Sequence, residues 1–252
     1  MLPGPTAPRP RRELPLVQLL PNFLTLAALC AGLTAMRFAM DGRFEFAVGL
    51  IVLAAILDGL DGRVARLLSS ESALGAELDS LSDFLCFGVA PGIILYQWSL
   101  AQLPGFGWIA VLVLVICCAL RLARFNIASA AGSSEAKTWF QGVPSPAGAH
   151  LVLMPMYLDF LTEGRAVLHY GVVAVWTVIV AAMMLSHLPT WSFKSSTVYA
   201  DHARYVLLAF VGLAAILLNY PWLTLFLLGL AYLVTLPLAM RQYRRSKEGR
   251  QG

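Results

Sequence analysis

Four aspartates lie close together in a chain that is otherwise strongly apolar: Asp58, Asp61, Asp79 and Asp83. Six of the 14 acidic residues of the chain fall between positions 58 and 83. Acids at membrane depth are costly and usually mark an ion or substrate site. Clustered carboxylates stay ionised together only when a cation compensates them. Because oxygen ligands favour hard divalent ions, the cluster predicts a site for Mg²⁺, Mn²⁺ or Ca²⁺.

The spacing of these aspartates suits two helix ends that face one cavity. Asp58 and Asp61 are three residues apart, and Asp79 and Asp83 are four apart, so each pair shares one face of a helix. A linker at 67–74 joins the two helices. The simpler interpretation is that the carboxylates cap helices and face water at the membrane surface.

The residues between the aspartates suit a ligand that carries phosphate. Gly62 and Gly75 remove side chains where a ligand or a neighbouring helix can approach the backbone. Arg66 offers a fork-shaped donor that matches phosphate geometry.

The rest of the chain must place this segment in a lipid bilayer. Hydrophobic residues make up 59% of the 252 positions and charged residues only 13%, about half the share of a soluble domain. The basic residues are dispersed, so the net charge of +4 does not indicate a nucleic-acid partner. The hydropathy pattern predicts an all-α, polytopic membrane helix bundle with about eight spans. The expected spans are 20–40, 44–63, 76–97, 106–124, 146–161, 168–188, 203–219 and 221–240.

The basic residues also predict the orientation of the chain. With the N-terminus in the cytoplasm, 15 of the 18 Lys and Arg residues fall on the cytoplasmic side, and only Arg37, Arg43 and Arg165 fall on the other. This asymmetry favours an even number of spans with both termini in the cytoplasm. The aspartate segment then lies at the cytoplasmic face.

The organisation that we expect has four parts. A cytoplasmic tail covers 1–19, a membrane core covers 20–200, two additional spans cover 201–240, and a basic cytoplasmic tail covers 241–252. The four cysteines show no spacing typical of metal or redox sites, and the four histidines form no metal pair, so we interpret both sets as structural.

The complete pattern D-x2-D-G-x2-A-R-x8-G-x3-D-x3-D, at positions 58–83, resembles the signature of the CDP-alcohol phosphatidyltransferase family without a departure at any defined position. PNFLTL at 21–26 resembles the start of the family's first membrane helix. RLARFN at 121–126, GVPSPAGA at 142–149 and SFK at 192–194 are most similar to the phosphatidylserine synthase branch. The matches run from about residue 20 to 195.

The resemblance implies a role for each residue of the motif. Asp58, Asp61 and Asp79 would bind the divalent metal, Mg²⁺ or Mn²⁺, and Asp83 would complete a site for two ions or lie beside it. Asp83 would also act as the general base. The residues expected to line the CDP pocket are Asn22, Thr25, Asp58, Asp61, Gly62, Ala65, Arg66 and Gly75.

The acceptor side rests on residues outside the motif. Arg121 and Arg124 could bind a phosphate or a serine carboxylate, or could be basic anchors at the membrane surface. Asn126, Ser145 and Lys194 complete the candidate acceptor set.

The resemblance implies an integral protein of the bacterial inner membrane, a homodimer with its active site facing the cytoplasm. It would transfer the phosphatidyl group of CDP-diacylglycerol to the hydroxyl of L-serine. The same chemistry with choline, glycerol 3-phosphate or an inositol phosphate stays open. A cation transporter is a third hypothesis, which the clustering of the acids at one membrane face and the lack of a repeated half disfavour.

Overall fold

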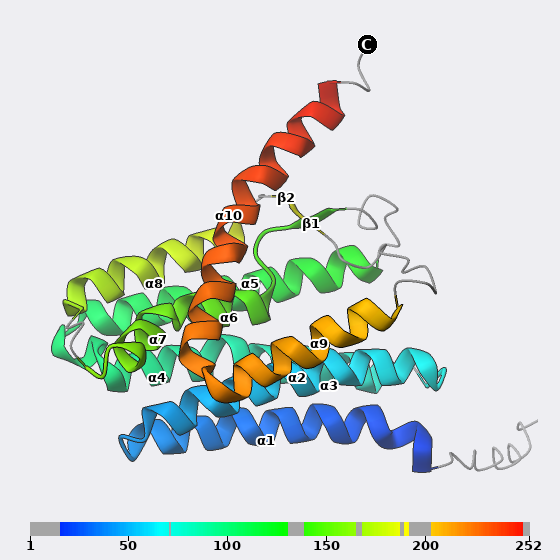
Figure 1. Cartoon of the computed structure of the whole chain (residues 1–252), viewed down its shortest axis with the longest axis horizontal. Helices are drawn as coiled ribbons and strands as arrows, with labels where there is room; N and C mark the ends of the chain where they lie inside the picture. Colours follow the sequence, from blue (N-terminus) through cyan, green and yellow to red (C-terminus); the bar gives the residue numbers. More distant parts are fainter. Residues whose placement is uncertain are drawn as a thin grey trace, which may run out of the picture.

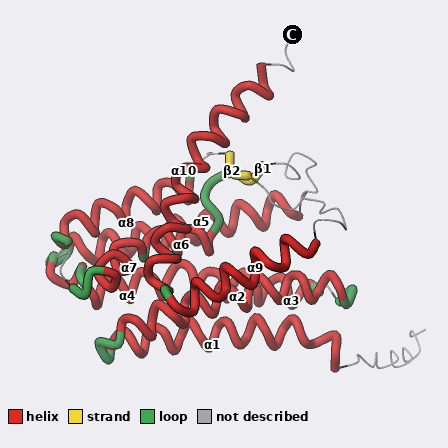
Figure 2. The backbone as a smooth tube through the Cα atoms, viewed as in Figure 1, coloured by secondary structure: helices red, strands yellow, loops and turns green. Residues whose placement is uncertain are grey.

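The computed structural model describes residues 16–70, 72–130, 139–164, 168–186, 189–191 and 203–248. Within these ranges the chain is almost entirely helical (Figure 1; Figure 2). The α-helices are α1 (Leu20–Met40), α2 (Phe44–Leu67), α3 (Ala73–Phe84), α4 (Ala90–Trp98), α5 (Phe106–Ala130), α6 (Ser145–Val152), α7 (Met154–Leu161), α8 (Tyr170–Leu185), α9 (Ala203–Asn219) and α10 (Pro221–Glu248). Shorter elements are the 3₁₀ turns η1 (Leu16–Leu19) and η3 (Leu100–Gln102), the π-helical turn η2 (Leu85–Val89), and the strands β1 (Trp139–Gln141) and β2 (Pro189–Trp191).

Four helical stretches of the described residues are long and apolar enough to cross a membrane: Val17–Met40, Ala73–Trp98, Phe106–Ala128 and Pro221–Met240. Large apolar side chains are exposed along them, as expected for helices that face lipid. Helix α2 has 24 residues, but the charges of the aspartate segment keep it out of this set. The helical class is therefore confirmed, whereas the eight spans and the cytoplasmic termini stay predictions.

Helices α1 and α2 form a close hairpin along one side of the bundle (Figure 1). Small side chains that let two helix backbones approach closely are buried along both helices. They are Ala28, Ala31, Ala35 and Ala39 on α1 and Ala47 and Ala54 on α2. This pairing sets the first turns of α1 beside the last turns of α2, where the aspartate segment begins.

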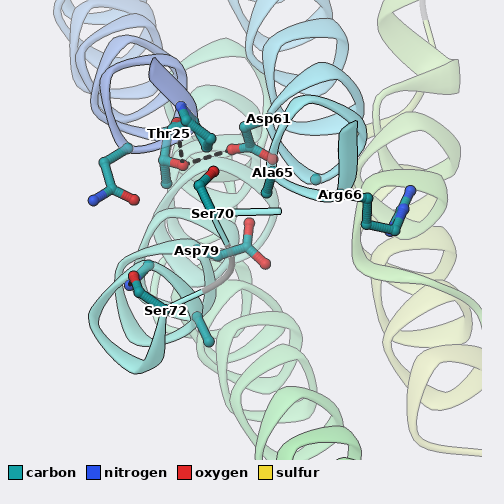
Figure 3. Close-up of a pocket in the computed structure, with 12 residues that line it drawn as sticks. Thr25, Asp61, Ala65, Arg66, Ser70, Ser72 and Asp79 are labelled. Carbon is teal, nitrogen blue, oxygen red and sulfur yellow. Dashed lines mark hydrogen bonds between the residues drawn. The ribbon is translucent and has the colours of Figure 1, made fainter. Parts of the chain in front are cut away.

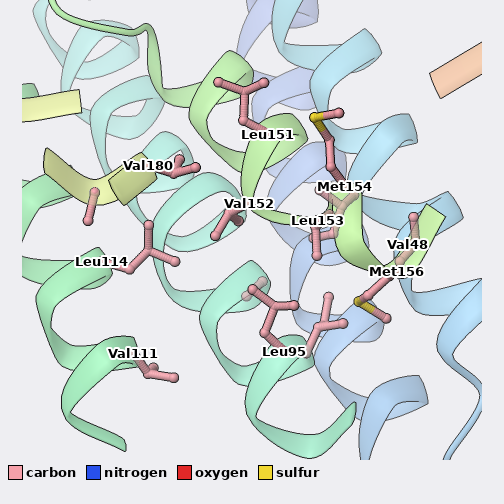
Figure 4. Close-up of a cluster of buried hydrophobic side chains, with 14 of the residues drawn as sticks. Val48, Leu95, Val111, Leu114, Leu151, Val152, Leu153, Met154, Met156 and Val180 are labelled. Carbon is pink, nitrogen blue, oxygen red and sulfur yellow. The ribbon is translucent and has the colours of Figure 1, made fainter. Parts of the chain in front are cut away.

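The hydrophobic core lies where α2, α4, α5, α6, α7 and α8 meet (Figure 4). Val48, Leu95, Leu114, Leu151 and Val180 are each fully buried there. The core therefore holds α2, which carries Asp58 and Asp61, against α5 and α6, which carry Arg121 and Ser145.

The expected fifth span at 146–161 is divided into two short helices, α6 and α7, which meet at Leu153. Pro155 follows the break, and its ring nitrogen cannot donate to the carbonyl of Leu151. The Trp176 indole Nε1 on α8 donates to that carbonyl oxygen instead, at 2.8 Å. A neighbouring helix thus satisfies the backbone group that the proline leaves free.

Two features differ from the expected layout. Strands β1 and β2 pair antiparallel within stretches that the sequence analysis left without regular structure. Helix α10 continues to Glu248, so the segment 241–248, expected to be a tail, is helical and projects from the bundle (Figure 1). The expected tail at 1–19 is described only from residue 16.

Gly142 explains why one of the family-like segments needs a glycine. Its φ is +81°, in the left-handed region that favours glycine. A Cβ atom there would lie 2.4 Å from the carbonyl oxygen of Met184. The neighbouring Val143 N–H donates to the Met183 carbonyl at 3.3 Å, which ties the segment before α6 to the end of α8.

Candidate active site

The carboxylates of Asp58, Asp61 and Asp79 converge between α2 and α3. One oxygen from each lies within 4.8 Å of the other two. Asp61 is buried, with 5% of its surface exposed, and the other two are half-buried. Three negative groups so close together, with only oxygen donors, form a set that can hold a hard divalent cation.

Asp83 lies beside this set rather than within it. Asp83 lies one helical turn beyond Asp79 on α3, and its carboxyl group interacts directly with that of Asp58 on α2. The Asp83 Oδ1 atom is buried and has no hydrogen-bond partner among the described residues. Such an atom is costly unless a ligand or a cation satisfies it. The π-helical turn η2 begins two residues later, and π turns are frequent at functional sites.

Helix α1 holds Asp61 in place. The Thr25 hydroxyl donates to Asp61 Oδ2 at 2.6 Å (Figure 3), and it also lies 3.1 Å from the Pro21 carbonyl oxygen of its own helix. The Ser82 hydroxyl donates to the Thr25 carbonyl at 3.4 Å, so that α3 contacts the same point of α1. The carboxylate of Asp61 is therefore oriented by a residue 36 positions away in the chain.

A pocket of about 270 Å³ opens beside the carboxylates, between α1, α2 and α3 (Figure 3). It is lined by Pro21, Asn22, Thr25, Asp61, Gly62, Ala65, Arg66, Ser70, Ser72, Gly75, Ala76 and Asp79. Seven of the eight residues that the sequence analysis assigned to the CDP pocket are in this lining, and the eighth, Asp58, lies in the carboxylate cluster.

The two motif glycines differ in what surrounds them. A Cβ atom on Gly75 would lie 3.0 Å from Asn22 Oδ1 and 3.1 Å from Ser72 Oγ, whereas a Cβ atom on Gly62 would meet only Arg66 Nη1, at 4.0 Å. The Gly75 N–H donates to Ser72 Oγ at 3.0 Å, so Ser72 caps α3. Arg66 is exposed and extends away from Asp61 and Asp79 (Figure 3).

On the acceptor side, three helices bring polar groups toward the aspartates. Arg121 of α5 donates to the hydroxyl of Ser145, which is fully buried at the start of α6. The guanidinium of Arg121 interacts electrostatically with Asp58, Asp83 and, on α10, Tyr232. The structure therefore brings Arg121 and Ser145 together beside Asp83.

The other candidate acceptor residues lie apart from this group. Arg124 is exposed and donates to the Leu185 carbonyl oxygen at 2.9 Å. The Asn126 amide donates to Ser80 Oγ at 3.0 Å, next to Asp79. Lys194 lies outside the described residues.

Three polar residues near the site, Ser70, Ser72 and Tyr232, are absent from the set of residues predicted from the sequence. Ser72 had a readable signal, because a serine just before an apolar helical stretch is typical of an N-cap. Ser70 lies in the unassigned linker of the motif. Tyr232 had no signal in the sequence, since only the packing of α10 brings it near Arg121.

Over most of its length the chain is similar to curated proteins that share one name. It is 38% identical to the CDP-diacylglycerol–serine O-phosphatidyltransferase of Mycobacterium leprae over 94% of this chain and 79% of that protein. It is 37% identical to the protein of that name from Mycobacterium tuberculosis strain H37Rv, over 94% and 83% of the two chains. The Helicobacter pylori strain J99 protein of that name is 37% identical over 70% and 73%.

Family sequence profiles match both parts of the chain. The profile described as CDP-alcohol phosphatidyltransferase 2 matches residues 202–237, which include α9 and most of α10. The profile of CDP-alcohol phosphatidyltransferase matches residues 18–193, which include the aspartate cluster and the pocket. Since the match at 18–193 covers more than half of the chain, the chain belongs to the CDP-alcohol phosphatidyltransferase family.

Proposed function

We propose that the chain is a CDP-diacylglycerol–serine O-phosphatidyltransferase. It transfers the phosphatidyl group of CDP-diacylglycerol to the hydroxyl of L-serine and releases CMP. The observation that carries this proposal is the identity of 37–38% over 94% of the chain to two mycobacterial proteins of that name. The converging carboxylates beside a pocket are the kind of site that a diphosphate substrate needs.

The oxygen donors fit a divalent cation, Mg²⁺ or Mn²⁺. Asp58, Asp61 and Asp79 would hold it, and Asp83, whose buried Oδ1 has no hydrogen-bond partner in the part of the chain that the structure describes, would complete a site for two ions. When bound, such ions neutralise the charge of a diphosphate and stabilise a phosphate leaving group. Without them, the carboxylates would repel the substrate.

The pocket would bind the nucleotide part of the donor. Asn22 and Thr25 of α1, and Gly62, Ala65 and Arg66 of α2, form walls on two sides, and Gly75 leaves room on the third. Arg66 points away from the carboxylates, so its contact with a phosphate would require a change of side-chain rotamer.

Asp83 would accept the proton of the serine hydroxyl. The oxygen of serine then forms a bond to the phosphorus that carries diacylglycerol, and the bond from that phosphorus to the oxygen of CMP breaks. CMP leaves with the electron pair of that bond. A carboxylate in this position is a reasonable base, because a free hydroxyl is a weak nucleophile.

Arg121 and Ser145 would bind the carboxylate of the incoming serine. The guanidinium lies near Asp83 and already contacts the buried Ser145 hydroxyl. Arginine suits a carboxylate because its two parallel N–H groups match the two oxygens. Arg124, Asn126 and Lys194 belong to this proposal only as a wider acceptor region.

We also propose that the site faces the cytoplasm of a bacterial inner membrane and that the protein is a homodimer. The orientation rests on the distribution of basic residues, and the homodimer rests on the family. The first turns of α1 and α3 and the last turns of α2 form one end of the bundle, so that a water-soluble nucleotide and serine would enter from one face.

The test supplies the purified full chain in detergent with CDP-diacylglycerol, Mg²⁺ or Mn²⁺, and one alcohol at a time, and follows CMP release. We expect CMP release with L-serine and little with choline, glycerol 3-phosphate or inositol phosphate. CMP release that does not depend on serine would refute the assignment of L-serine as the acceptor.

The role of Asp83 is tested in the same assay. Asp83→Asn should lower kcat by about 10²- to 10⁴-fold, the usual contribution of a general base. Asp159→Asn on α7, outside the site, is the matched control and should leave kcat near that of the wild type. An Asp83→Asn enzyme of full activity would exclude the proton transfer.

A further inference from the structure

The linker between α2 and α3 has a defined backbone geometry at the edge of the pocket. After α2 ends, the Ser69 N–H donates to the Arg66 carbonyl at 3.2 Å and the Ser70 N–H donates to the Ala65 carbonyl at 3.0 Å. These two bonds form a Schellman motif, with Ser69 at a φ of +49° where glycine is usual. Ser70 is therefore held by its own backbone against Ala65.

Ser70 is one of the residues that line the pocket. Its hydroxyl lies between Asp61 and Asp79 in the close-up view (Figure 3). The hydroxyl oxygen is buried and has no hydrogen-bond partner among the residues that the structure describes. A buried hydroxyl without a partner is costly, which points to a ligand that supplies one.

The other hydroxyls of the pocket already have partners. Thr25 donates to Asp61, and Ser72 accepts the N–H of Gly75. Carboxylates and phosphate oxygens only accept hydrogen bonds at neutral pH. A diphosphate next to Asp61 and Asp79 therefore needs neutral donors in addition to cations, and Ser70 offers one.

We propose that Ser70 is a positioning residue whose hydroxyl donates a hydrogen bond to the diphosphate of the CDP substrate. The position of Ser70 is one that the family motif leaves unspecified. The inference rests on the proposed function, because it takes a cytidine diphosphate as the ligand of the pocket.

The test measures the affinity of the intact protein for CDP by calorimetry, in detergent with Mg²⁺, so that no turnover is needed. Ser70→Ala should weaken CDP binding by about ten-fold, as expected when a hydrogen bond to a charged group is lost. Ser70→Thr keeps the hydroxyl and should bind CDP nearly as well as the wild type.

The control is Ser69→Gly, which keeps the linker geometry and removes a side chain that does not line the pocket. It should bind CDP as the wild type does, and thermal unfolding should show that all variants are folded. Equal affinities of the wild type and Ser70→Ala, or equal losses in Ser70→Ala and Ser70→Thr, would refute the role of Ser70. A wild type that does not bind CDP would instead refute the proposed function, and this role with it.

Discussion

Thr25→Val should weaken metal binding more than its small change in volume suggests. The Thr25 hydroxyl donates to Asp61 Oδ2 at 2.6 Å, and only 5% of the surface of Asp61 is exposed. A hydrogen bond to a charged group contributes about 1.5–3 kcal/mol. If the cation needs Asp61 in its present orientation, the loss corresponds to about 10- to 150-fold in metal affinity.

Thr177→Val on α8 is the matched control for this prediction. Both hydroxyls are buried, and each lies within hydrogen-bond distance of the carbonyl four residues earlier in its own helix: Pro21 at 3.1 Å for Thr25 and Val173 at 2.8 Å for Thr177. Only Thr25 also contacts a carboxylate. The difference between the two variants therefore isolates the bond to Asp61.

The assay is a Mn²⁺ titration of serine-dependent CMP release at saturating substrates. The Mn²⁺ concentration at half-maximal rate should rise by about 10- to 150-fold in Thr25→Val and stay near the wild-type value in Thr177→Val. A double-mutant cycle with Asp61→Asn should show that the two effects at this pair are not additive. Equal Mn²⁺ midpoints in the two threonine variants would refute the reasoning.

Two further predictions concern the fold. Gly142→Ala should lower the stability of the fold by more than Gly105→Ala does. Both glycines have positive φ, but of these two only a Cβ atom at position 142 would overlap a carbonyl oxygen of α8. Equal shifts in Tm would contradict this reasoning. Trp176→Phe should lower the free energy of unfolding by about 1–3 kcal/mol, because the Leu151 carbonyl loses its donor. The loss should be smaller in a Pro155→Ala background, because an alanine at this position has a backbone N–H that can donate to the Leu151 carbonyl. Tm values in detergent measure both, and an unchanged loss in the Pro155→Ala background would exclude the proposed compensation.

The aspartate cluster could be predicted from the sequence because its geometry is local. Asp58 and Asp61 share a face of one helix by their spacing, and Asp79 lies on the next helix after a short linker. Only a close approach of the two helices was needed to bring the three carboxylates within 4.8 Å, and the short linker limits how far apart the helix ends can be. The helical class followed in the same way from the apolar composition.

Other features depend on contacts between distant segments. The division of the fifth span at Leu153 is tolerated because Trp176 of another helix satisfies the Leu151 carbonyl, and no local pattern predicts that partner. The pairing of β1 and β2 joins segments about 50 residues apart, and neither strand is long enough to show an alternating pattern.

The chemistry of the site is divided in the same manner. Residue types and local spacing are sufficient to indicate a divalent cation and a phosphate ligand, because carboxylates on adjacent turns must lie together on any helix. Other features follow from how separate helices and a linker pack. They are the orientation of Asp61 by Thr25, the contact of Arg121 with Ser145, and the Ser70 hydroxyl, which has no partner among the described residues. Such contacts depend on the positions of backbones far apart in the chain, which side-chain spacing within one segment does not encode.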